Sequence, residues 1–315
     1  MFRIITLLAA LATVAAAQAL TVFPTHNNGG SFFETAALQG LKGAVHTVIS
    51  RVQPVPAKGT IPWGESRKTY DAKGYLLSHE EYMDGKLLTS STYVFGRDYR
   101  TCTETDKRRP VEATPSVPGP TPGQGQARAP QMPMETRVIK YTYNAKGQWV
   151  AQRIENGKVL STTTYTFAKG HLVTSVKVVR KEVMVRKWLK LQKARKDVEV
   201  ERTTYKYDQY GNVTAVTSVK QSGMRNTETT VYNYAKNSVA CTIKQNQYVV
   251  MRLGEYYSND GLLIKSTNTS ASTTLLTYTK FDTTGNWITC TRQDASNPIE
   301  HKDISTREIT YYPAK

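Results

Sequence analysis

Histidine, the residue that most often binds metals or carries protons in enzymes, is scattered along this chain. The five histidines are His26, His46, His79, His171 and His301. No two of them stand at the spacing of a metal site, and H-E-x-x-H, G-x-S-x-G, P-loop and dinucleotide-binding glycine motifs are all missing from the sequence. The sequence therefore predicts no metal, no cofactor and no catalytic residue.

Paired carboxylates are the other chemistry to consider, because a glycan hydrolase needs two of them beside the scissile bond. Residues 79–81 form a local His-Glu-Glu cluster, but neighbours on a predicted strand point to opposite faces. Asp71, Asp208 and Asp282 stand where tight turns need them. A glycan-acting enzyme with a dispersed site stays an alternative, and a cleft holding two carboxylates with displaced pKa values would identify it.

A basic segment over residues 177–202 is the main candidate for a binding surface. A polyanion patch is predicted there, formed by Arg186, Lys187, Lys190 and Lys193. Its partner would be a cell-envelope polysaccharide or another anionic surface, and no specific nucleic acid is expected. The alternative is a solvated hairpin whose lysines discourage edge-to-edge aggregation.

Two tryptophans, Trp149 and Trp287, are candidate aromatic contacts for a ligand such as a sugar ring. Both follow a glycine turn on predicted strands, so cross-strand packing explains them equally well.

A repeated turn motif must position all of these residues. Five segments share the pattern aromatic-[Asp/Asn/Ser]-x-x-Gly-x-apolar, and they begin at Tyr70, Tyr143, Tyr207, Tyr257 and Phe281. Asp, Asn or Ser followed by Gly three residues later suits a type I turn with a glycine bulge, which closes a β-hairpin. The register of such a turn pairs the first residue with the seventh, and that residue is apolar or aromatic in all five segments: Leu76, Trp149, Val213, Leu263 and Trp287. Asp84-Gly85 and Asn156-Gly157 suit two-residue hairpins.

The flanks of these turns alternate aromatic and polar residues at period two, as half-buried strands do. Residues 205–214, Tyr-Lys-Tyr-Asp-Gln-Tyr-Gly-Asn-Val-Thr, resemble a YD repeat, the unit of Rhs-type proteins, and residues 282–287 resemble a degenerate copy. Residues 41–48 are similar to the opening strand of exported bacterial YD-repeat-like proteins of unknown function. The resemblance covers residues 41–312 and implies successive hairpins in an elongated, curled sheet. It supplies no catalytic residues.

Composition and length place this sheet in an exported protein. The chain has 315 residues and a formal charge of +17, and it is 39% hydrophobic, which excludes a multi-span helical membrane protein. Residues 1–19 have the features of a signal peptide ending in Ala-Gln-Ala, and no transmembrane anchor is expected after cleavage. Residues 20–40 are predicted to be a flexible arm, and residues 41–312 an all-β domain interrupted by a Pro-rich disordered insertion at 107–135.

Three cysteines, Cys102, Cys241 and Cys290, leave open whether a disulfide forms. The resulting prediction is an exported, non-enzymatic β-repeat protein, periplasmic or extracellular, with a binding or structural role in the envelope. The alternatives are the glycan-acting enzyme and an outer-membrane β-barrel. Alternation and tyrosine content fit a barrel, whereas the Thr/Lys-rich polar face gives no clear lipid-facing band.

Overall fold

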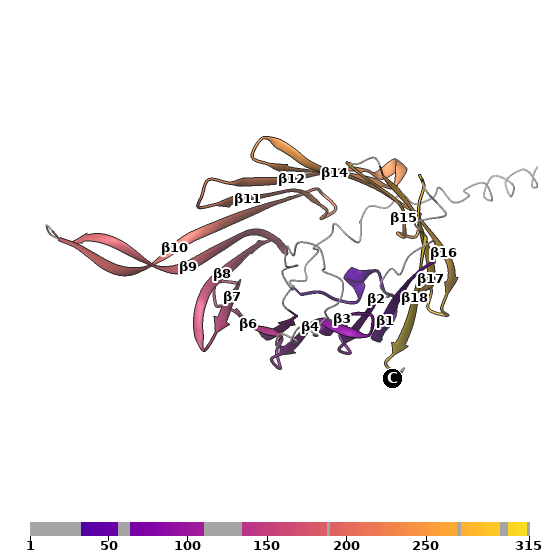
Figure 1. Cartoon of the computed structure of the whole chain (residues 1–315), viewed down its shortest axis with the longest axis horizontal. Coiled ribbons are helices and arrows are strands. Elements are labelled where there is room, and N and C mark those ends of the chain that lie inside the picture. Colours follow the sequence, from indigo (N-terminus) through magenta and orange to yellow (C-terminus); the bar gives the residue numbers. More distant parts are fainter. Residues whose placement is uncertain are drawn as a thin grey trace, which may run out of the picture.

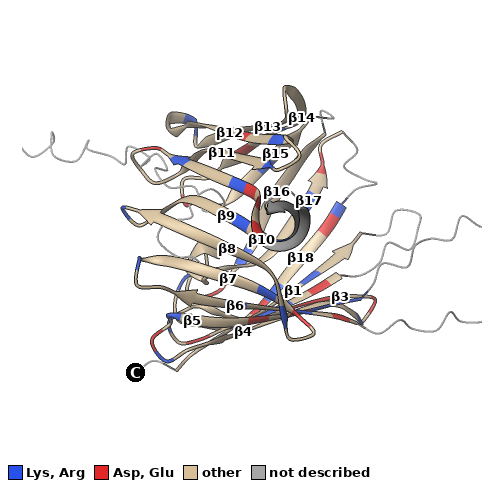
Figure 2. Ribbon diagram, turned by 90° about the vertical axis from the view of Figure 1, so that its left-hand side faces the viewer, with Lys and Arg blue, Asp and Glu red and all other residues tan. Residues whose placement is uncertain are grey.

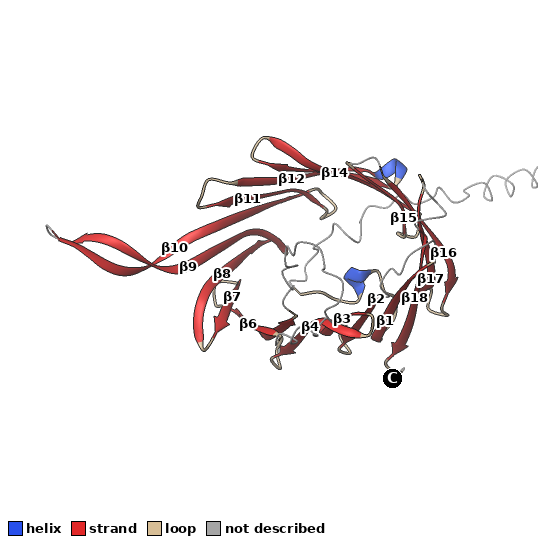
Figure 3. Cartoon of the chain, viewed as in Figure 1, coloured by secondary structure: helices blue, strands red, loops and turns tan. Residues whose placement is uncertain are grey.

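A computed structural model describes residues 33–55, 64–109, 134–187, 190–269, 272–296 and 302–313. Within these ranges the chain is almost entirely β-structure, with two short 3-10 helices (Figure 3). The elements are η1 (Ala37–Gln39), β1 (Val45–Pro54), β2 (Gly64–Tyr70), β3 (Leu76–Met83), β4 (Lys86–Phe95), β5 (Thr101–Arg108), β6 (Glu135–Tyr143), β7 (Gln148–Glu155), β8 (Lys158–Ala168), β9 (His171–Lys187), β10 (Lys190–Tyr207), β11 (Val213–Lys220), β12 (Arg225–Asn233), η2 (Tyr234–Lys236), β13 (Ser238–Gln245), β14 (Tyr248–Tyr257), β15 (Leu263–Asn268), β16 (Thr273–Phe281), β17 (Trp287–Asp294) and β18 (Lys302–Tyr311).

The strands form one closed antiparallel barrel (Figure 1). Each of the 18 strands pairs with its neighbours in sequence, and β18 returns to pair with β1 from Val45–Tyr311 to Pro54–Asp303. Closure satisfies the backbone groups that an open sheet would leave at its two edges. The prediction of antiparallel hairpins is therefore confirmed, but the elongated, curled open sheet is wrong.

The five repeated turns have the register that the sequence predicts. The first and seventh residues face each other in every motif: Tyr70–Leu76, Tyr143–Trp149, Tyr207–Val213, Tyr257–Leu263 and Phe281–Trp287. The motif glycines all adopt positive φ angles, from 70° at Gly147 to 86° at Gly74. This left-handed conformation costs other residues about 1–2 kcal/mol, so the glycines specify where each hairpin turns.

All five motif turns lie at one end of the barrel, which we call the motif end. The start of β1 and the end of β18 lie at this end too, because the strand number is even and every pairing is antiparallel. Two longer connections, residues 55–63 after β1 and 109–134 after β5, belong to the opposite end.

A short segment, residues 33–43, lies inside the ring at the motif end, where Figure 1 shows η1 surrounded by strands. The Phe33 ring makes edge contacts with Phe95, Tyr141 and Trp149 at centroid distances of 5.0, 5.2 and 5.2 Å. Glu34 forms an ion pair of 2.9 Å with Lys68 of β2. The described part of the predicted arm is therefore packed rather than loose, and its contacts define the inner face of the barrel.

The main apolar core forms where this segment covers the inner wall. Its buried members are Ala36, Leu41, Val45, Val48, Tyr70 and Leu76, with Tyr93, Ile309 and Tyr311 packed against them. The remaining inner wall carries polar and charged side chains among aromatic ones. A core confined to one end explains the low apolar content of the sequence.

The longest hairpin, β9–β10, projects beyond the barrel (Figure 1). Its strands pair from Lys187–Lys190 to Thr174–Thr204, with one register shift between Glu199 and Glu201. No helix among the described residues is long and apolar enough to cross a membrane.

Candidate functional site

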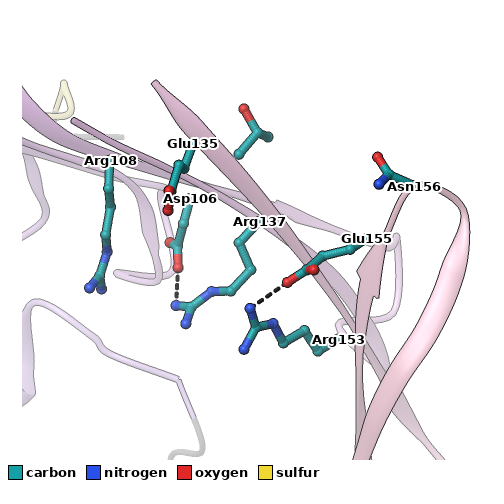
Figure 4. A pocket seen from close by; sticks show the side chains of 8 residues that line it. Asp106, Arg108, Glu135, Arg137, Arg153, Glu155 and Asn156 are labelled. Atoms are coloured by element: carbon teal, nitrogen blue, oxygen red, sulfur yellow. Dashed lines mark hydrogen bonds and ion pairs between the residues drawn. The ribbon is translucent and has the colours of Figure 1, made fainter. Parts of the chain in front are cut away.

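A charged pocket of about 550 Å³ lies on the inner wall at the β5–β7 strands (Figure 4). Strand alternation points every second side chain inward, and the register aligns these side chains across the three strands. Its walls are Asp106, Arg108, Glu135, Thr136, Arg137, Arg153, Glu155 and Asn156. The pocket thus combines three guanidinium groups with three carboxylates.

Two ion pairs organise the pocket (Figure 4). Arg137 binds the buried carboxylate of Asp106, which also accepts a hydrogen bond of 2.8 Å from the Ser91 hydroxyl. Arg153 pairs with Glu155 two residues along β7. Nε of Arg137 and Nε of Arg153 are buried and have no hydrogen-bond partner among the described residues. The donors that remain open to a polar solute with oxygen acceptors are therefore the terminal guanidinium nitrogens that face the pocket.

Arg108 and Glu135 complete the pocket as cross-strand neighbours in the β5–β6 register. With both signs of charge facing one space, the pocket suits a polar or zwitterionic molecule better than a simple anion.

A second carboxylate, Glu104, lies on the same face as Asp106 but belongs to a separate, smaller cavity of about 170 Å³ under Phe33. Hydroxyl groups of Tyr93 and Tyr141 donate hydrogen bonds to its two oxygens, at 3.4 Å for Tyr93. Each of the two carboxylates is held by donors from the protein, and the two groups, two residues apart on β5, also interact electrostatically with each other.

The turn aspartates form a recurrent site at the motif end that sequence reasoning only partly anticipated. In Asp208 one carboxylate oxygen accepts backbone N–H groups of Tyr210 and Asn212 at 2.8 and 2.9 Å, and the other accepts the Tyr234 hydroxyl. Asp282 repeats this arrangement with Thr284, Asn286 and Tyr311. In Asp71 the backbone donors are Lys73 and Tyr75, and the hydroxyl is that of Tyr99 at 2.5 Å.

These hydrogen bonds change the acidity of the groups involved. Burial alone would raise the pKa of Asp208 and of Asp282, yet both pKa values are lowered, because a tyrosine hydroxyl and backbone N–H groups stabilise the charged form. The hydrogen bond to Asp71, together with partial burial, raises the pKa of Tyr99 to about 12. The turns at Asp208 and Asp282 are therefore stabilised by ionised aspartates at neutral pH.

The predicted polyanion patch lies at the tip of the β9–β10 hairpin. The register places Arg186 opposite Leu191, Lys187 opposite Lys190 and Lys193 opposite Met184. The side chains of residues 182–195 are outside the described part of the structure, so their proposed role stays a prediction. Over the rest of the barrel, Figure 2 shows Lys and Arg spread over many strands, with Asp and Glu interspersed.

The two predicted aromatic contacts are both engaged within the protein. Trp149 packs against Phe33 and, at 5.4 Å, against Tyr143. The Trp287 ring lies 5.6 Å from Tyr278 and under the Arg307 guanidinium, whose central carbon is 3.5 Å from the ring centroid. The structure does not bring the two tryptophans together, since they belong to β7 and β17.

All three cysteines, Cys102, Cys241 and Cys290, are buried free thiols. The described residues include no group of three or more His, Cys, Asp or Glu side chains that could hold a metal ion.

The charged pocket was missed by sequence reasoning. Its residues carry no motif, and Arg108 and Glu135 lie at the two edges of the predicted Pro-rich insertion that separates β5 from β6 in sequence. The available signal was alternation: Asp106 and Arg108, then Glu135 and Arg137, stand two residues apart on strands that the sequence would pair.

No protein-family model matches, and no curated protein matches. Among solved structures, the barrel is similar to the crystal structure of a porin-like protein from Bacteroides uniformis, with 12% identity and a TM-score of 0.45 over 89% of this chain and 100% of that one. The assignment to the YD-repeat family is wrong: no family model supports it, and the hairpins close into one barrel instead of an open repeat sheet.

Proposed function

We propose that this protein is a β-barrel of the bacterial cell envelope whose lumen binds or admits small polar solutes, with no catalytic step. The observation that carries the proposal is the charged pocket on the inner wall of a closed ring of 18 strands. Barrels of this strand number are wide enough to enclose an aqueous interior. The signal-like residues 1–19 support export.

The first candidate location is the outer membrane. An even number of antiparallel strands, closure of the last strand on the first, and short turns at one end with longer connections at the other are general features of bacterial outer-membrane barrels. This barrel has each of these features.

The second candidate location is an aqueous part of the envelope, and the outer face of the barrel favours it. One outward row across β4–β8 consists of Val94, Thr103, Lys140, Gln152 and Thr162. A lysine or arginine facing lipid at the bilayer centre costs about 2–4 kcal/mol. On the seam between β18, β1 and β2, Arg51 binds Glu65 at 2.8 Å and also Glu308, which adds charge to the same outer face.

Fractionation separates the two locations. Cells producing the full chain are lysed, and the envelope is washed with alkaline carbonate. Retention in the washed outer membrane places the barrel in lipid, and release places it in water. A protein that stays in the cytoplasm with residues 1–19 uncleaved would refute the envelope proposal itself.

The lumen is tested with a paired-charge variant. The double variant Asp106→Asn with Arg137→Gln removes one ion pair of the pocket and leaves the neighbouring pair of Arg153 and Glu155 intact. If the barrel lies in a membrane, single-channel recordings of the variant should show a changed ion selectivity. If the barrel lies in water, the variant should bind zwitterionic solutes such as glycine betaine more weakly. The exterior variant Lys140→Gln is the matched control. Equal behaviour of both variants and the unmodified protein would contradict a functional lumen.

A further inference from the structure

A second pocket lies inside the barrel at the motif end, between the inner segment and strands β14–β18. Its volume is about 250 Å³. The walls include Tyr257, Leu263, Tyr278, Trp287 and Arg307 from the strands and Lys42 from the inner segment. The volume lies just below the range of about 300–1,000 Å³ usual for drug-sized ligands, which restricts an occupant to a small molecule.

Arg307 in this pocket differs from the ion-paired arginines of the barrel. Arg51, Arg137 and Arg153 each bind a carboxylate. Among the described residues Arg307 has no ion pair and donates no hydrogen bond, and its Nε is buried without a partner. Its guanidinium lies against the ring of Trp287.

The surroundings of Arg307 are aromatic rather than acidic. It extends from β18 toward Tyr70, Tyr278 and Cys290, which are neutral near pH 7. One acid, Asp260, also lines the pocket but forms no ion pair with Arg307. Removing a guanidinium from water without a counter-ion costs free energy. Arg307 therefore places a charge at this cavity that no carboxylate of the described residues compensates.

We propose that this pocket binds a small organic carboxylate through Arg307, with the apolar part of the molecule lying against Tyr278 and Trp287. The planar guanidinium matches the two oxygens of a carboxylate and can donate two parallel hydrogen bonds. Aromatic walls favour a flat apolar body next to that group. The site does not depend on the charged pocket at β5–β7.

Lys42, which also lines the pocket, adds a second positive charge. Asn286, a buried residue of the repeated turn, holds the Lys42 backbone by accepting its N–H at 2.7 Å and donating to its carbonyl at 2.9 Å. The same asparagine donates to the Tyr311 hydroxyl at 2.7 Å. The repeated turn between β16 and β17 thus fixes the inner segment where it completes the pocket.

Binding to the purified protein tests the proposal, with benzoate as the probe. Acetate lacks the flat ring, inorganic phosphate lacks the carboxylate, and chloride controls for ionic strength. Calorimetry and the shift of the melting temperature with ligand concentration are measured for the unmodified protein and for Arg307→Met. Arg292→Met is the matched control, because Arg292 of β17 also lies on the inner face of the barrel and is paired in register with Asp303 of β18.

We expect saturable benzoate binding that is tighter than acetate binding, and a loss of roughly tenfold to a hundredfold in affinity in Arg307→Met, the range for a charge-assisted bidentate contact. Without ligand, Arg307→Met should melt at a higher temperature, because the unpaired charge is gone, and Arg292→Met should keep the benzoate response. A lower melting temperature for Arg307→Met with unchanged benzoate binding would assign the arginine a packing role and overturn the proposal. Equal effects of phosphate and benzoate, or no response beyond chloride, would overturn it as well.

Discussion

At the residue scale, a few side chains of the repeated turn determine much of the molecule. The aspartate accepts backbone N–H groups, the glycine supplies the left-handed conformation, and the flanking aromatic residue pairs across the hairpin. All three roles could be predicted from one sequence, because they depend on neighbours within seven residues. The tyrosine hydroxyls on Asp71, Asp208 and Asp282 could not, since their donors come from a later strand or turn.

The turn aspartates should make stability depend on acidic pH. The pKa values of Asp208 and Asp282 are lowered in the folded state, so these two carboxylates stabilise the barrel above the ordinary pKa of about 4 and lose this contribution as pH falls through the lowered values. Asp208→Asn with Asp282→Asn should lower the melting temperature at pH 7 and flatten its decline below about pH 4. Asn144→Ala, which removes the amide that plays the same role in another turn, should lower the melting temperature without changing that decline. Parallel acid curves for both variants would contradict the prediction.

The glycine of the same turn gives a second residue-scale prediction. Gly211 has a φ of 85°, so Gly211→Val should destabilise the barrel by about 1–2 kcal/mol, the cost of a branched residue in that conformation. Gly64→Val is the control, because an added Cβ at Gly64 meets no atom within 4 Å and its φ is not positive. Chemical denaturation measures both changes. A Gly211 variant as stable as the Gly64 variant would rule out the turn assignment.

At the element scale, hairpins follow from local sequence, but the position of the inner segment does not. Alternation and turn chemistry identify β10 and β11 with their register. Nothing in residues 33–43 indicates that Phe33 meets β4, β6 and β7, because these contacts depend on the curvature of the complete sheet. The charged pocket has the same origin, since it requires β5 and β6 to pair across the insertion.

Phe33 should hold the inner segment in place. Its three edge contacts are each worth about 0.5–1.5 kcal/mol. Phe33→Ala should therefore expose the segment, and limited proteolysis should cleave within residues 33–43 faster than in the unmodified protein while the strands stay resistant. Phe281→Ala, at a position 45% exposed, is the control and should leave cleavage unchanged. Equal cleavage rates for all three proteins would show that Phe33 does not anchor the segment.

The tip of the β9–β10 hairpin carries the predicted basic patch. Replacing Lys187, Lys190 and Lys193 by Glu should reduce retention on a sulfonate column and on anionic vesicles at low salt, with the loss shrinking as salt rises because exposed charges are screened. Lys236, Lys244 and Lys280 changed together to Glu give the same change of net charge elsewhere on the barrel. If the two triple variants elute alike, net charge explains retention and the patch has no separate role.

At the scale of the whole molecule, closure is the property that local sequence did not reveal. Each hairpin is compatible with an open sheet, and only the pairing of β1 with β18 makes a barrel. That pairing joins residues far apart in sequence, such as Val48 and Ile309, and no local motif marks it. The seam is reinforced on its outer face by Arg51, which bridges Glu65 of β2 and Glu308 of β18.

Removing the last strand should convert the barrel into an aggregating sheet. A chain ending at residue 296 lacks β18 and leaves β17 and β1 with unpaired backbone groups, which are templates for association with other chains. We expect sedimentation velocity to show large oligomers in place of one species, together with loss of a single cooperative melting transition. A chain ending at residue 313 keeps β18 and the hydrogen bond of 2.7 Å from the Tyr312 hydroxyl to the Tyr70 carbonyl, and it should behave as the full chain does. If the shorter chain does not accumulate, the variant Arg51→Met can be measured instead, because it weakens the same seam in the complete chain. Its melting temperature should fall further than that of Arg252→Met, an outward arginine on β14 far from the seam, and equal shifts would contradict a stabilising role for closure.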